Sequence, residues 1–428
     1  MVKVQSWGRL NAPTHHLHPF NRDTPSFDMP LPLLPFGNGR SYGDVCLNPN
    51  GHLIQTKQLD RFIHFNPSDG LLTCEAGILL QTIHKHLVPQ GWMLPVTPGT
   101  QLITVGGAIA NDVHGKNHHQ WGTFGNHVQS FKLLRTDNQI LTCSLTENTE
   151  LFHATIGGLG LTGILLEVTL QLRSIASPWY LTESIPYYSL EEFFNLADTS
   201  TPHYEHTVSW LDCCSGEQVK GIFMRANGIP YEQEAPKPAI KSMPITPPFS
   251  LINQYSLKAF NELYFYLHKN KKNPQVQHYE PFFYPLDSIH DWNKIYGPKG
   301  FYQYQVVIPK NESYPAISEL LKVIAKHQQG SFLAVLKTFG HKKSPGMLSF
   351  PMEGATLALD FPNLGDKTLK LFNLLDTIVK EARGRIYPAK DARMSKALFE
   401  AGYPNYLAFL KYRDRGIRSS LSQRLLGY

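Results

Sequence analysis

The chain of 428 residues contains few cysteines, and their spacing argues against a disulfide framework or a zinc site. The five cysteines lie at positions 46, 74, 143, 213 and 214, an odd number without a CxxC pair. Disulfide-stabilised secreted proteins use even sets of cysteines, and zinc sites use closely spaced pairs. We therefore expect a protein of a reducing compartment, the cytoplasm, in which Cys213 and Cys214 are reduced thiols.

Long hydrophobic runs and concentrated positive charge are also missing. No stretch approaches the ~20 apolar residues of a membrane span, and the first residues lack the apolar core of a signal peptide. Charged residues make up 17% of the chain, and the net charge of +6 is not gathered into a basic stripe. This argues against a nucleic-acid partner. The excess of positive charge fits an anionic ligand or a peripheral contact with an anionic membrane.

Glycine is concentrated in two loops about 60 residues apart. The first reads GNGRSYGD (37–44), and the second combines PGT (98–100) with TVGGAIANDVHG (104–115). Glycines let backbone N–H groups approach a phosphate closely. Two such loops suit a long ligand with a central pyrophosphate and a ring system at one end. The pattern therefore favours a flavin dinucleotide over a mononucleotide.

A third glycine motif, GLGLTG (158–163), matches the spacing of a dinucleotide-binding fingerprint. That fingerprint requires a strand before it and a helix after it. Here we expect a helix over 150–156 and a strand over 164–172, which is the reverse order. The motif therefore does not predict a nicotinamide site, although its glycines could pass close to the adenine half of a flavin dinucleotide.

Three histidines, His114, His118 and His119, follow the second glycine loop. The helical HExxH pattern typical of a catalytic zinc site is absent, so we expect no metal. His114 directly follows the run of small residues and is the better candidate for a position near the flavin ring. His118 and His119 are expected to pack or form hydrogen bonds.

The pattern of apolar residues predicts an α+β protein of two domains, since the chain exceeds the usual size of one. Residues 11–36 are rich in proline and histidine and are expected to form an extended arm. The character of the chain changes near residue 178, where strands and helices become longer. We expect strands at 52–55, 71–76, 129–135, 140–143, 164–172, 301–308 and 331–339, and helices at 78–87, 150–156, 314–327 and 367–382.

Several polar residues stand among apolar neighbours in the second half, and each has two interpretations. Lys337 lies within FLAVLKTF (332–339), either at an exposed edge or facing a cavity. Lys390 lies beside Asp391 and Arg393, either in a surface charge cluster or in a site. The residues alone do not choose between these alternatives.

Read together, the motifs resemble the FAD-binding enzymes of the vanillyl-alcohol-oxidase superfamily (the PCMH/VAO type). Within it, the chain is similar to the oxidases that act on polyprenylphosphoryl-ribose. The strings that carry the resemblance keep their order from residue 37 to the C-terminal region. They are GRSYGD (39–44), PGT (98–100), TVGGAIA (104–110), HGKNHH (114–119), FGNHV (124–128), GLTGI (160–164), PLD (285–287), YGP (296–298), QYQ (303–305), LSFP (348–351), DFP (360–362) and AKD (389–391).

The resemblance implies a two-domain fold in which an antiparallel sheet forms the substrate-binding, or cap, domain. The FAD-binding domain would comprise 1–177, the substrate domain 178–384, and residues 385–428 would return to the FAD-binding domain. It further implies FAD-dependent oxidation of the ribose 2′-hydroxyl to a 2′-keto sugar, the first half of an epimerisation to an arabinose donor of the cell envelope. An NAD(P)H-dependent ketoreductase would act on the keto intermediate.

The same resemblance assigns roles to individual residues. Catalysis would fall to Lys390, His114 and Tyr42. The expected FAD-binding residues are Gly37, Asn38, Gly39, Arg40, Ser41, Tyr42, Gly43, Gly99, Thr104, Val105, Gly106, Gly107, Asn111, His114, Ile164 and Tyr387. The expected substrate-binding residues are Lys116, Trp210, Tyr284, Gln303, Gln305 and Lys337.

The chain departs from the family in three places. Members with covalent flavin carry a histidine in the first loop where this chain has Arg40, so we expect a dissociable FAD. The usual strand–helix–strand before the first loop is missing from residues 1–36. A cysteine two residues before the DFP motif is replaced by Ala358.

The sequence is also compatible with two other functions. An oxidase of free sugars or alditols could use the same scaffold, although it would prefer a covalent flavin and need no phosphate-binding lysine. A flavin-binding component without catalytic activity is the other, and the retention of Lys390 and His114 argues against it.

Overall fold

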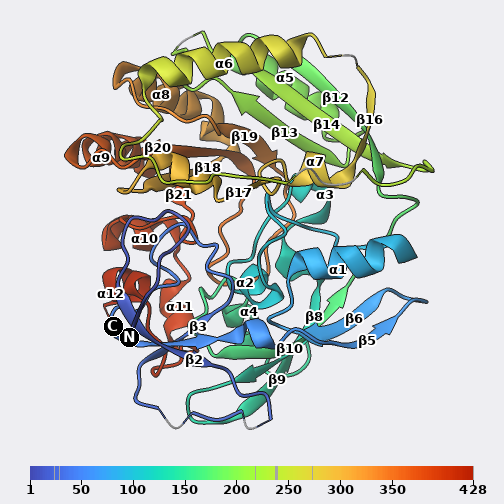
Figure 1. Cartoon of the computed structure of the whole chain (residues 1–428), viewed down its shortest axis with the longest axis vertical. Helices are drawn as coiled ribbons and strands as arrows, with labels where there is room; N and C mark the ends of the chain where they lie inside the picture. Colours follow the sequence, from blue (N-terminus) through green and yellow to red (C-terminus); the bar gives the residue numbers. More distant parts are fainter. Residues whose placement is uncertain (24, 28, 217, 237–239, 272, 428) are drawn as a thin grey trace.

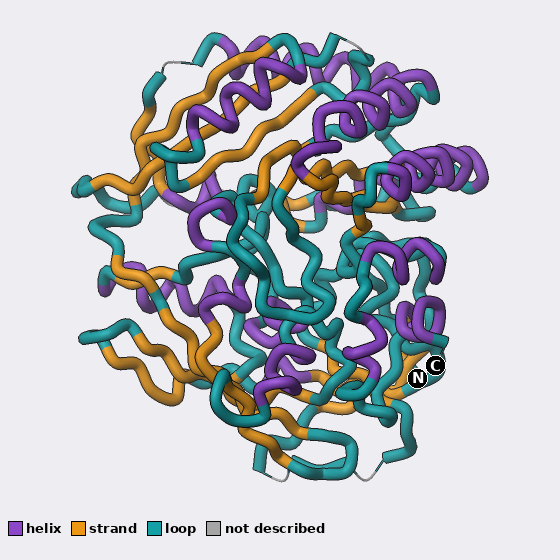
Figure 2. Tube along the Cα trace, turned by 180° about the vertical axis from the view of Figure 1, so that it is seen from behind, coloured by secondary structure: helices purple, strands orange, loops and turns teal. Residues whose placement is uncertain are grey.

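The computed structural model describes residues 1–428 except 24, 28, 217, 237–239, 272 and 428. Figure 1 shows two layered halves, a lower one built mainly from the first part of the chain and an upper one built from the second. The amino and carboxyl ends lie side by side in the lower half in both Figure 1 and Figure 2. The C-terminal segment therefore returns to the half in which the chain began.

The upper half is organised around one large sheet, the cap sheet, in which all recorded pairings are antiparallel. This confirms the α+β fold with an antiparallel substrate sheet. In spatial order its strands are β16 (Gln275–His278), β12 (Trp179–Tyr187), β14 (Gly221–Ile229), β13 (His206–Leu211), β19 (Val335–Phe339), β20 (Gly354–Pro362), β18 (Phe301–Pro309) and β21 (Arg385–Ile386). β19 is shorter than the expected strand at 331–339.

Helices cover one face of the cap sheet because its alternate residues are apolar. α5 (Leu190–Ser200), α8 (Ser313–Lys326) and α9 (Asp366–Glu381) share one continuous core with that face. The last two confirm the helices expected from the apolar spacing. α6 (Gln254–Lys269) lies apart from them and contacts β12 and β14 along the outer edge of the cap (Figure 1).

A second sheet, the central sheet, forms the core of the lower half. Its strands, in spatial order, are β5 (Phe62–Asn66), β6 (Leu71–Glu75), β10 (Ile164–Gln171), β8 (Val128–Leu134) and β9 (Ile140–Ser144). The expected hairpin between β8 and β9 is confirmed, and Asn138 adopts a positive φ of 66° in its turn. α1 (Leu80–Leu87), α2 (Val105–Ala110) and α4 (Thr149–Thr155) pack on this sheet in a common apolar core.

The expectation of an extended arm over residues 11–36 is wrong. β2 (Thr14–Pro19) and β3 (Leu33–Phe36) both pair in parallel with β4 (His52–Gln55), and β1 (Val2–Lys3) pairs with β2. No helix is described between β2 and β3, so two parallel strands are joined by irregular chain. Histidine and proline hide the strand pattern in the sequence. β3 ends at Phe36 and leads directly into the first glycine loop.

The C-terminal segment carries α10 (Lys396–Gly402), α11 (Tyr406–Leu410) and α12 (Ser420–Leu426) and closes the lower half. Ile417 forms a β-bridge with Leu33 next to the first loop. Arg424 lies 2.9 Å from Asp44 and 2.9 Å from Asp391 in two ion pairs. The end of the chain thereby holds the first glycine loop against the segment that carries Lys390.

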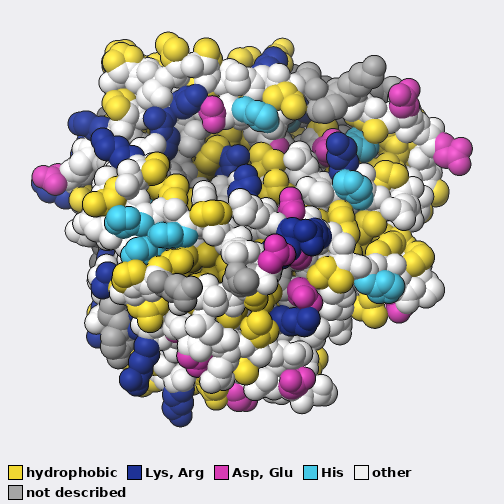
Figure 3. All heavy atoms as spheres, turned by 60° about the horizontal axis from the view of Figure 1, so that its bottom comes forward, with side chains coloured by type: hydrophobic (Ala, Val, Ile, Leu, Met, Phe, Trp, Pro, Cys, Tyr) yellow, Lys and Arg dark blue, Asp and Glu magenta, His cyan; other side chains and the backbone are white. Residues whose placement is uncertain are grey.

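On the face shown in Figure 3, lysine and arginine side chains lie in several small groups, one of them at the upper left, among hydrophobic side chains. Among the described residues, no helix is long and apolar enough to cross a bilayer. No group of three histidine, cysteine or acidic side chains in the described part of the chain could hold a metal ion.

Gly43 fixes the approach of the first loop to the C-terminal segment. A Cβ atom at this position would lie 1.6 Å from the carbonyl oxygen of Asp391. We expect Gly43→Ala to lower the free energy of unfolding by roughly 3 kcal/mol or more, because backbone must move to relieve the overlap. Chemical denaturation measures this loss.

Gly228→Ala is the matched control, because its Cβ would meet only Tyr180, at 3.7 Å. Equal stability of the two variants would contradict the tight packing of the first loop against residue 391.

Candidate active site

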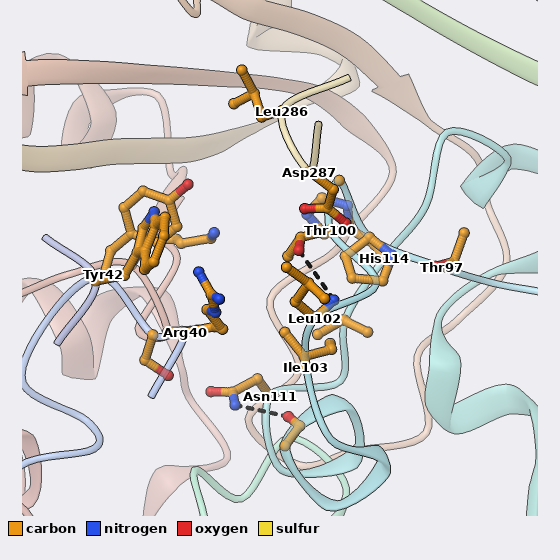
Figure 4. Close-up of a pocket in the computed structure, with 18 of the residues that line it drawn as sticks. Arg40, Tyr42, Thr97, Thr100, Leu102, Ile103, Asn111, His114, Leu286 and Asp287 are labelled. Atoms are coloured by element: carbon orange, nitrogen blue, oxygen red, sulfur yellow. Dashed lines mark hydrogen bonds between the residues drawn. The ribbon is translucent and has the colours of Figure 1, made fainter. Parts of the chain in front are cut away.

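A cavity of about 1010 Å³ lies between the two halves of the molecule. Figure 4 shows Arg40 and Tyr42 of the first loop on one side and Thr100, Leu102, Asn111 and His114 on the other. Leu286 and Asp287 reach in from the cap. Cavities of this size exceed what a small metabolite requires and suit a dinucleotide together with a second ligand.

The two glycine loops form opposite walls of the cavity and are tied to each other. The side-chain amide of Asn38 donates a hydrogen bond of 2.7 Å to the carbonyl of Leu102. The Arg40 guanidinium stacks over the ring of Trp7 at 4.1 Å. Within the described chain, the structure gives no acceptor for the backbone N–H groups of residues 37–41. Such unpaired donors on a glycine loop are suited to phosphate oxygens.

A third wall of the cavity is the face of the cap sheet that points toward the FAD-binding half. Its polar residues occur at every second position, because alternate side chains of a strand point to the same face. On β18, Gln303 and Gln305 line the cavity, whereas Tyr304 and Val306 are buried in the core under the helices. On β20, Asp360 likewise faces the cavity between apolar neighbours. Lys337 of β19 is 7% exposed and lines the cavity. The interpretation of Lys337 as an exposed edge lysine is therefore wrong.

His114 is the residue at which both halves meet. Lys337 Nζ lies 2.8 Å from His114 Nδ1 and donates a hydrogen bond of 2.5 Å to the Gly115 carbonyl. The side-chain amide of Gln305 lies 3.0 Å from His114 Nε2. Burial, and then the charge of Lys337, hold the pKa of His114 well below its usual value. His114 is therefore neutral, and because the amide nitrogen of Gln305 can only donate, His114 Nε2 accepts its hydrogen bond.

Three lysines of the site are partly or wholly removed from water, and this desolvation disfavours their charged form. It lowers the pKa of Lys116 to about 8 and that of Lys390 to about 8. It also holds the pKa of Lys337 far below its usual value, with Lys116 adding to the shift. Lys116 Nζ donates a hydrogen bond of 2.8 Å to the Phe283 carbonyl. The site therefore offers lysine amines that can be neutral near physiological pH.

Lys390 is paired electrostatically with Asp360. Its Nζ lies 3.8 Å from the centroid of the Tyr42 ring, and the charge of Asp360 partly offsets the effect of burial on its pKa. Burial in turn raises the pKa of Asp360 to about 7. One Asp360 oxygen accepts a hydrogen bond of 2.6 Å from Gln303, and the other has no protein partner among the described residues. A free acceptor thus faces the cavity next to a lysine that can lose its proton.

The structure brings most of the expected site residues together around this cavity. Those that line it are Gly37, Asn38, Gly39, Arg40, Ser41, Tyr42, Gly99, Thr104, Gly106, Gly107, Asn111, His114, Lys116, Ile164, Trp210, Gln303, Gln305, Lys337, Tyr387 and Lys390.

Three expected residues do not line the cavity in the described structure. Gly43 packs against residue 391, and Val105 is fully buried in the core of the central sheet. The Tyr284 hydroxyl lies 2.6 Å from the Thr97 hydroxyl and 3.2 Å from His84 Nδ1. Tyr284 therefore supports the second loop from behind instead of facing a ligand.

Sequence reasoning assigned no role to Asp360 and Asp287, although both stand in the quoted DFP and PLD motifs. Asp287 accepts a hydrogen bond of 2.8 Å from the backbone of Gln101 and fixes the PGT turn. Its charge also acts on Arg40 across the cavity. Asp360 could have been predicted as a site residue because it is a carboxylate inside an apolar strand. Such groups are buried mainly at functional sites.

The residues present fit FAD. A Cβ on Gly99 or Gly160 would meet no atom within 4 Å, so these backbones border open space. Gly106 and Gly107 belong to α2. The Gly107 N–H donates to the Thr104 hydroxyl and its carbonyl accepts from the Asn111 side-chain amide, whereas the Gly106 N–H donates to the Ala76 carbonyl. The Asn111 side-chain oxygen is buried without a partner among the described residues. Tyr387 stacks on Phe350 and donates a hydrogen bond of 2.8 Å to the Asn111 carbonyl, which completes a flat aromatic wall.

Comparison with known proteins agrees with this cavity. Residues 28–144 match the FAD binding domain family. The chain is 33% identical over 411 residues to the decaprenylphosphoryl-beta-D-ribose oxidase of Mycolicibacterium smegmatis, covering 91% of this chain and 88% of that protein. It is 30% identical to an uncharacterized protein of Streptomyces coelicolor, over 76% of this chain and 92% of the relative. The L-gulonolactone oxidase of Mus musculus is 32% identical over 137 residues, 32% of this chain and 30% of the mouse protein.

The fold, the cavity and these matches define an FAD-dependent oxidoreductase that acts on CH–OH groups. Because the similarity to the mycobacterial protein extends over nearly the whole of both chains, this chain belongs to the family of decaprenylphosphoryl-ribose oxidases. The expectation of FAD as cofactor is thereby confirmed, and its dissociable attachment stays a prediction.

A side chain at position 99 would project into the open space of the cavity. We expect Gly99→Leu to weaken FAD binding at least about tenfold, because the leucine occupies volume that the flavin dinucleotide needs. The stability of the flavin-free protein should not change, because no protein atom lies within 4 Å of a Cβ atom at position 99. Fluorescence titration of the flavin-free protein with FAD measures the affinity.

Gly228→Leu, at an exposed glycine outside the cavity, is the control. If both variants bind FAD as tightly as the unchanged protein, the second loop does not contact the cofactor.

Proposed function

We propose that this protein oxidises the 2′-hydroxyl of a polyprenylphosphoryl-β-D-ribose to the 2′-keto sugar. The observation that carries the proposal is the Lys390–Asp360 pair, which lines the same cavity as neutral His114. The mycobacterial relative bears the name of a ribose oxidase of this substrate class. Its similarity includes the cap sheet, from which the substrate-facing residues come.

The lysines of the cavity suit the phosphate of such a substrate. Lys337 is buried and Lys116 is half-buried, and neither has an ion-pair partner among the described residues. A phosphodiester would restore their charged forms, because an opposite charge at close range favours the ammonium ion. The same phosphate would gain two charge-assisted hydrogen bonds in a site shielded from water.

When bound, FAD supplies the acceptor for the hydride that leaves the ribose C2′ carbon. The protein must take the proton of the 2′-hydroxyl, and the neutral amine of Lys390 is suited to this task because its pKa lies near 8. Neutral His114 accepts a hydrogen bond from the Gln305 amide at Nε2 and thereby orients Gln305 beside the sugar. The substrate loses a hydride and a proton, and a carbonyl forms at C2′.

The keto product requires a separate reductant to become the epimeric alcohol. The glycine motif at 158–163 is followed by β10 and preceded by α4, the reverse of a nicotinamide site. An NAD(P)H-dependent ketoreductase acting on the released ketone would complete the epimerisation to the arabinose donor.

Anaerobic mixing with a short-chain polyprenylphosphoryl-ribose tests the proposal directly. The visible band of the bound flavin should bleach as the substrate is oxidised. The similarity to the mouse L-gulonolactone oxidase covers only 137 residues, 32% of this chain. A flavin that stays oxidised with this lipid but bleaches with free alditols or sugar lactones would overturn the proposal in favour of an oxidase of soluble sugars.

Replacement of the base should separate flavin binding from catalysis. We expect Lys390→Met to retain FAD but to slow flavin reduction by roughly 10²–10⁴-fold, the usual contribution of a general base. Stopped-flow absorbance measures the reduction rate. Lys85→Met, at an exposed lysine of α1, is the control. An unchanged rate in Lys390→Met would remove the assigned role.

The pH dependence of flavin reduction should report the Lys390–Asp360 pair. Because Lys390 has a lowered pKa of about 8, its neutral form grows between pH 7 and 9, and the rate should rise through this window. Asp360 stabilises the charged lysine. Asp360→Asn should therefore shift the rise to lower pH, by roughly one unit.

Asp287→Asn is the matched control, since Asp287 acts on Arg40 and Lys116 and not on Lys390. Its rate profile should keep the same inflection. Identical inflections in all three proteins would show that the pair does not govern proton transfer.

A further inference from the structure

The exposed face of α6 is apolar, which is the reverse of what a surface helix of a water-soluble domain shows. Tyr255, Leu263, Tyr266 and Leu267 are 77%, 57%, 60% and 53% exposed. With about 100° of rotation per residue, these four side chains fall on one side of the helix. The opposite side, with Leu257 and Phe265, is buried against the cap. The helix therefore carries two apolar faces, and only one of them has a partner.

Basic residues accompany the apolar face. Residues 240–271 contain four lysines, at 241, 258, 269 and 271, and a single acidic residue, Glu262. Glu262 is already paired with Lys220 at 2.6 Å. The net positive charge disfavours a second copy of the same surface and favours an anionic partner. Tyrosine at the border of apolar and polar surroundings is typical of the interface of a bilayer.

The inner side of α6 belongs to the cavity described above. Tyr264, His268 and Lys271 line it, as does Ile240 in the segment before the helix. The Tyr264 ring lies 4.5 Å from that of Trp210, on the strand next to the one that carries Lys337. The exposed apolar face therefore lies on the helix whose other side lines the cavity next to Trp210.

We propose that the outer face of α6, formed by Tyr255, Leu263, Tyr266 and Leu267, is a docking surface for an anionic lipid bilayer. The helix lies in the plane of the interface, its apolar face among the acyl chains and its lysines at the headgroups. The proposal deepens the proposed function and rests on it, because a substrate with a long polyprenyl chain then passes from the bilayer into the cavity beneath the helix.

Sedimentation with vesicles tests the surface in the FAD-bound protein. The unchanged protein should bind vesicles of phosphatidylcholine and phosphatidylglycerol and bind pure phosphatidylcholine more weakly. The variant with Tyr255→Ser, Leu263→Ser, Tyr266→Ser and Leu267→Ser should lose at least about tenfold in partitioning, because four apolar groups leave the interface. Lys258→Gln with Lys269→Gln and Lys271→Gln should weaken binding to the anionic vesicles only.

The matched control is Leu145→Ser with Leu407→Ser, two equally exposed leucines, 61% and 62%, in the other half of the molecule. This variant should partition like the unchanged protein, and all variants should retain the flavin band. No vesicle binding by the unchanged protein, or equal binding by the serine variant, would overturn the docking surface. A dimer in solution that the serine variant dissociates would also overturn it, in favour of a second copy.

Flavin bleaching by a short-chain substrate in detergent separates this proposal from the function on which it rests. Bleaching without vesicle binding removes the docking surface alone. Vesicle binding through α6 without bleaching supports the surface and removes the assigned substrate.

Discussion

Desolvation of lysine is the constraint around which this molecule is organised. Lys116, Lys337 and Lys390 reach one cavity from three separate parts of the chain, and each is removed from water. A buried ammonium ion without a partner is costly, so the lysines respond by losing affinity for their protons. The same cost would make an incoming anion bind well and keeps an amine available as a base. Binding and proton transfer thus draw on one physical cause.

The cavity exists because one sheet has two different faces. On β18 and β20 the alternation of side chains sends Tyr304, Leu357 and Leu359 under the helices and Gln303, Gln305 and Asp360 toward the FAD-binding half. The helices α8 and α9 are therefore needed on one face only. The other face is covered partly by α6, at Trp210 and Ile222, and partly by the glycine loops, whose lack of side chains leaves the space that the cofactor requires. His114 links the two halves, because its ring forms hydrogen bonds with Gln305 of β18 and Lys337 of β19.

The loops and the pattern of the long helices could be predicted from the sequence because both depend on local signals. Glycine spacing located the residues of both loops, and apolar periodicity placed α8 and α9. The N-terminal strands escaped prediction because β2 and β3 gain their stability from β4, which lies distant in sequence, and not from their own proline- and histidine-rich segments. Lys337 was ambiguous, and Tyr284 was assigned to the substrate, for a related reason. Only the packing of the two halves determines which face of a strand or turn meets the cavity, and no local signal reports it.

A chain of contacts orders the cavity by polarity from one end to the other. It starts at Tyr264 on α6, continues to Trp210, and reaches Lys337 two residues from the partner of Trp210 on β19. Lys337 then contacts His114, which packs near Tyr387, and Tyr387 is bonded to Asn111 beside the glycines of α2. Aromatic, cationic and finally small residues follow one another along this path. The proposed substrate, an amphiphile with an anionic headgroup, would match that order with its apolar chain under α6 and its sugar at His114. The exposed apolar face of α6 extends the same gradient beyond the cavity, which is why the surface of the cap and its interior are best understood as one binding path.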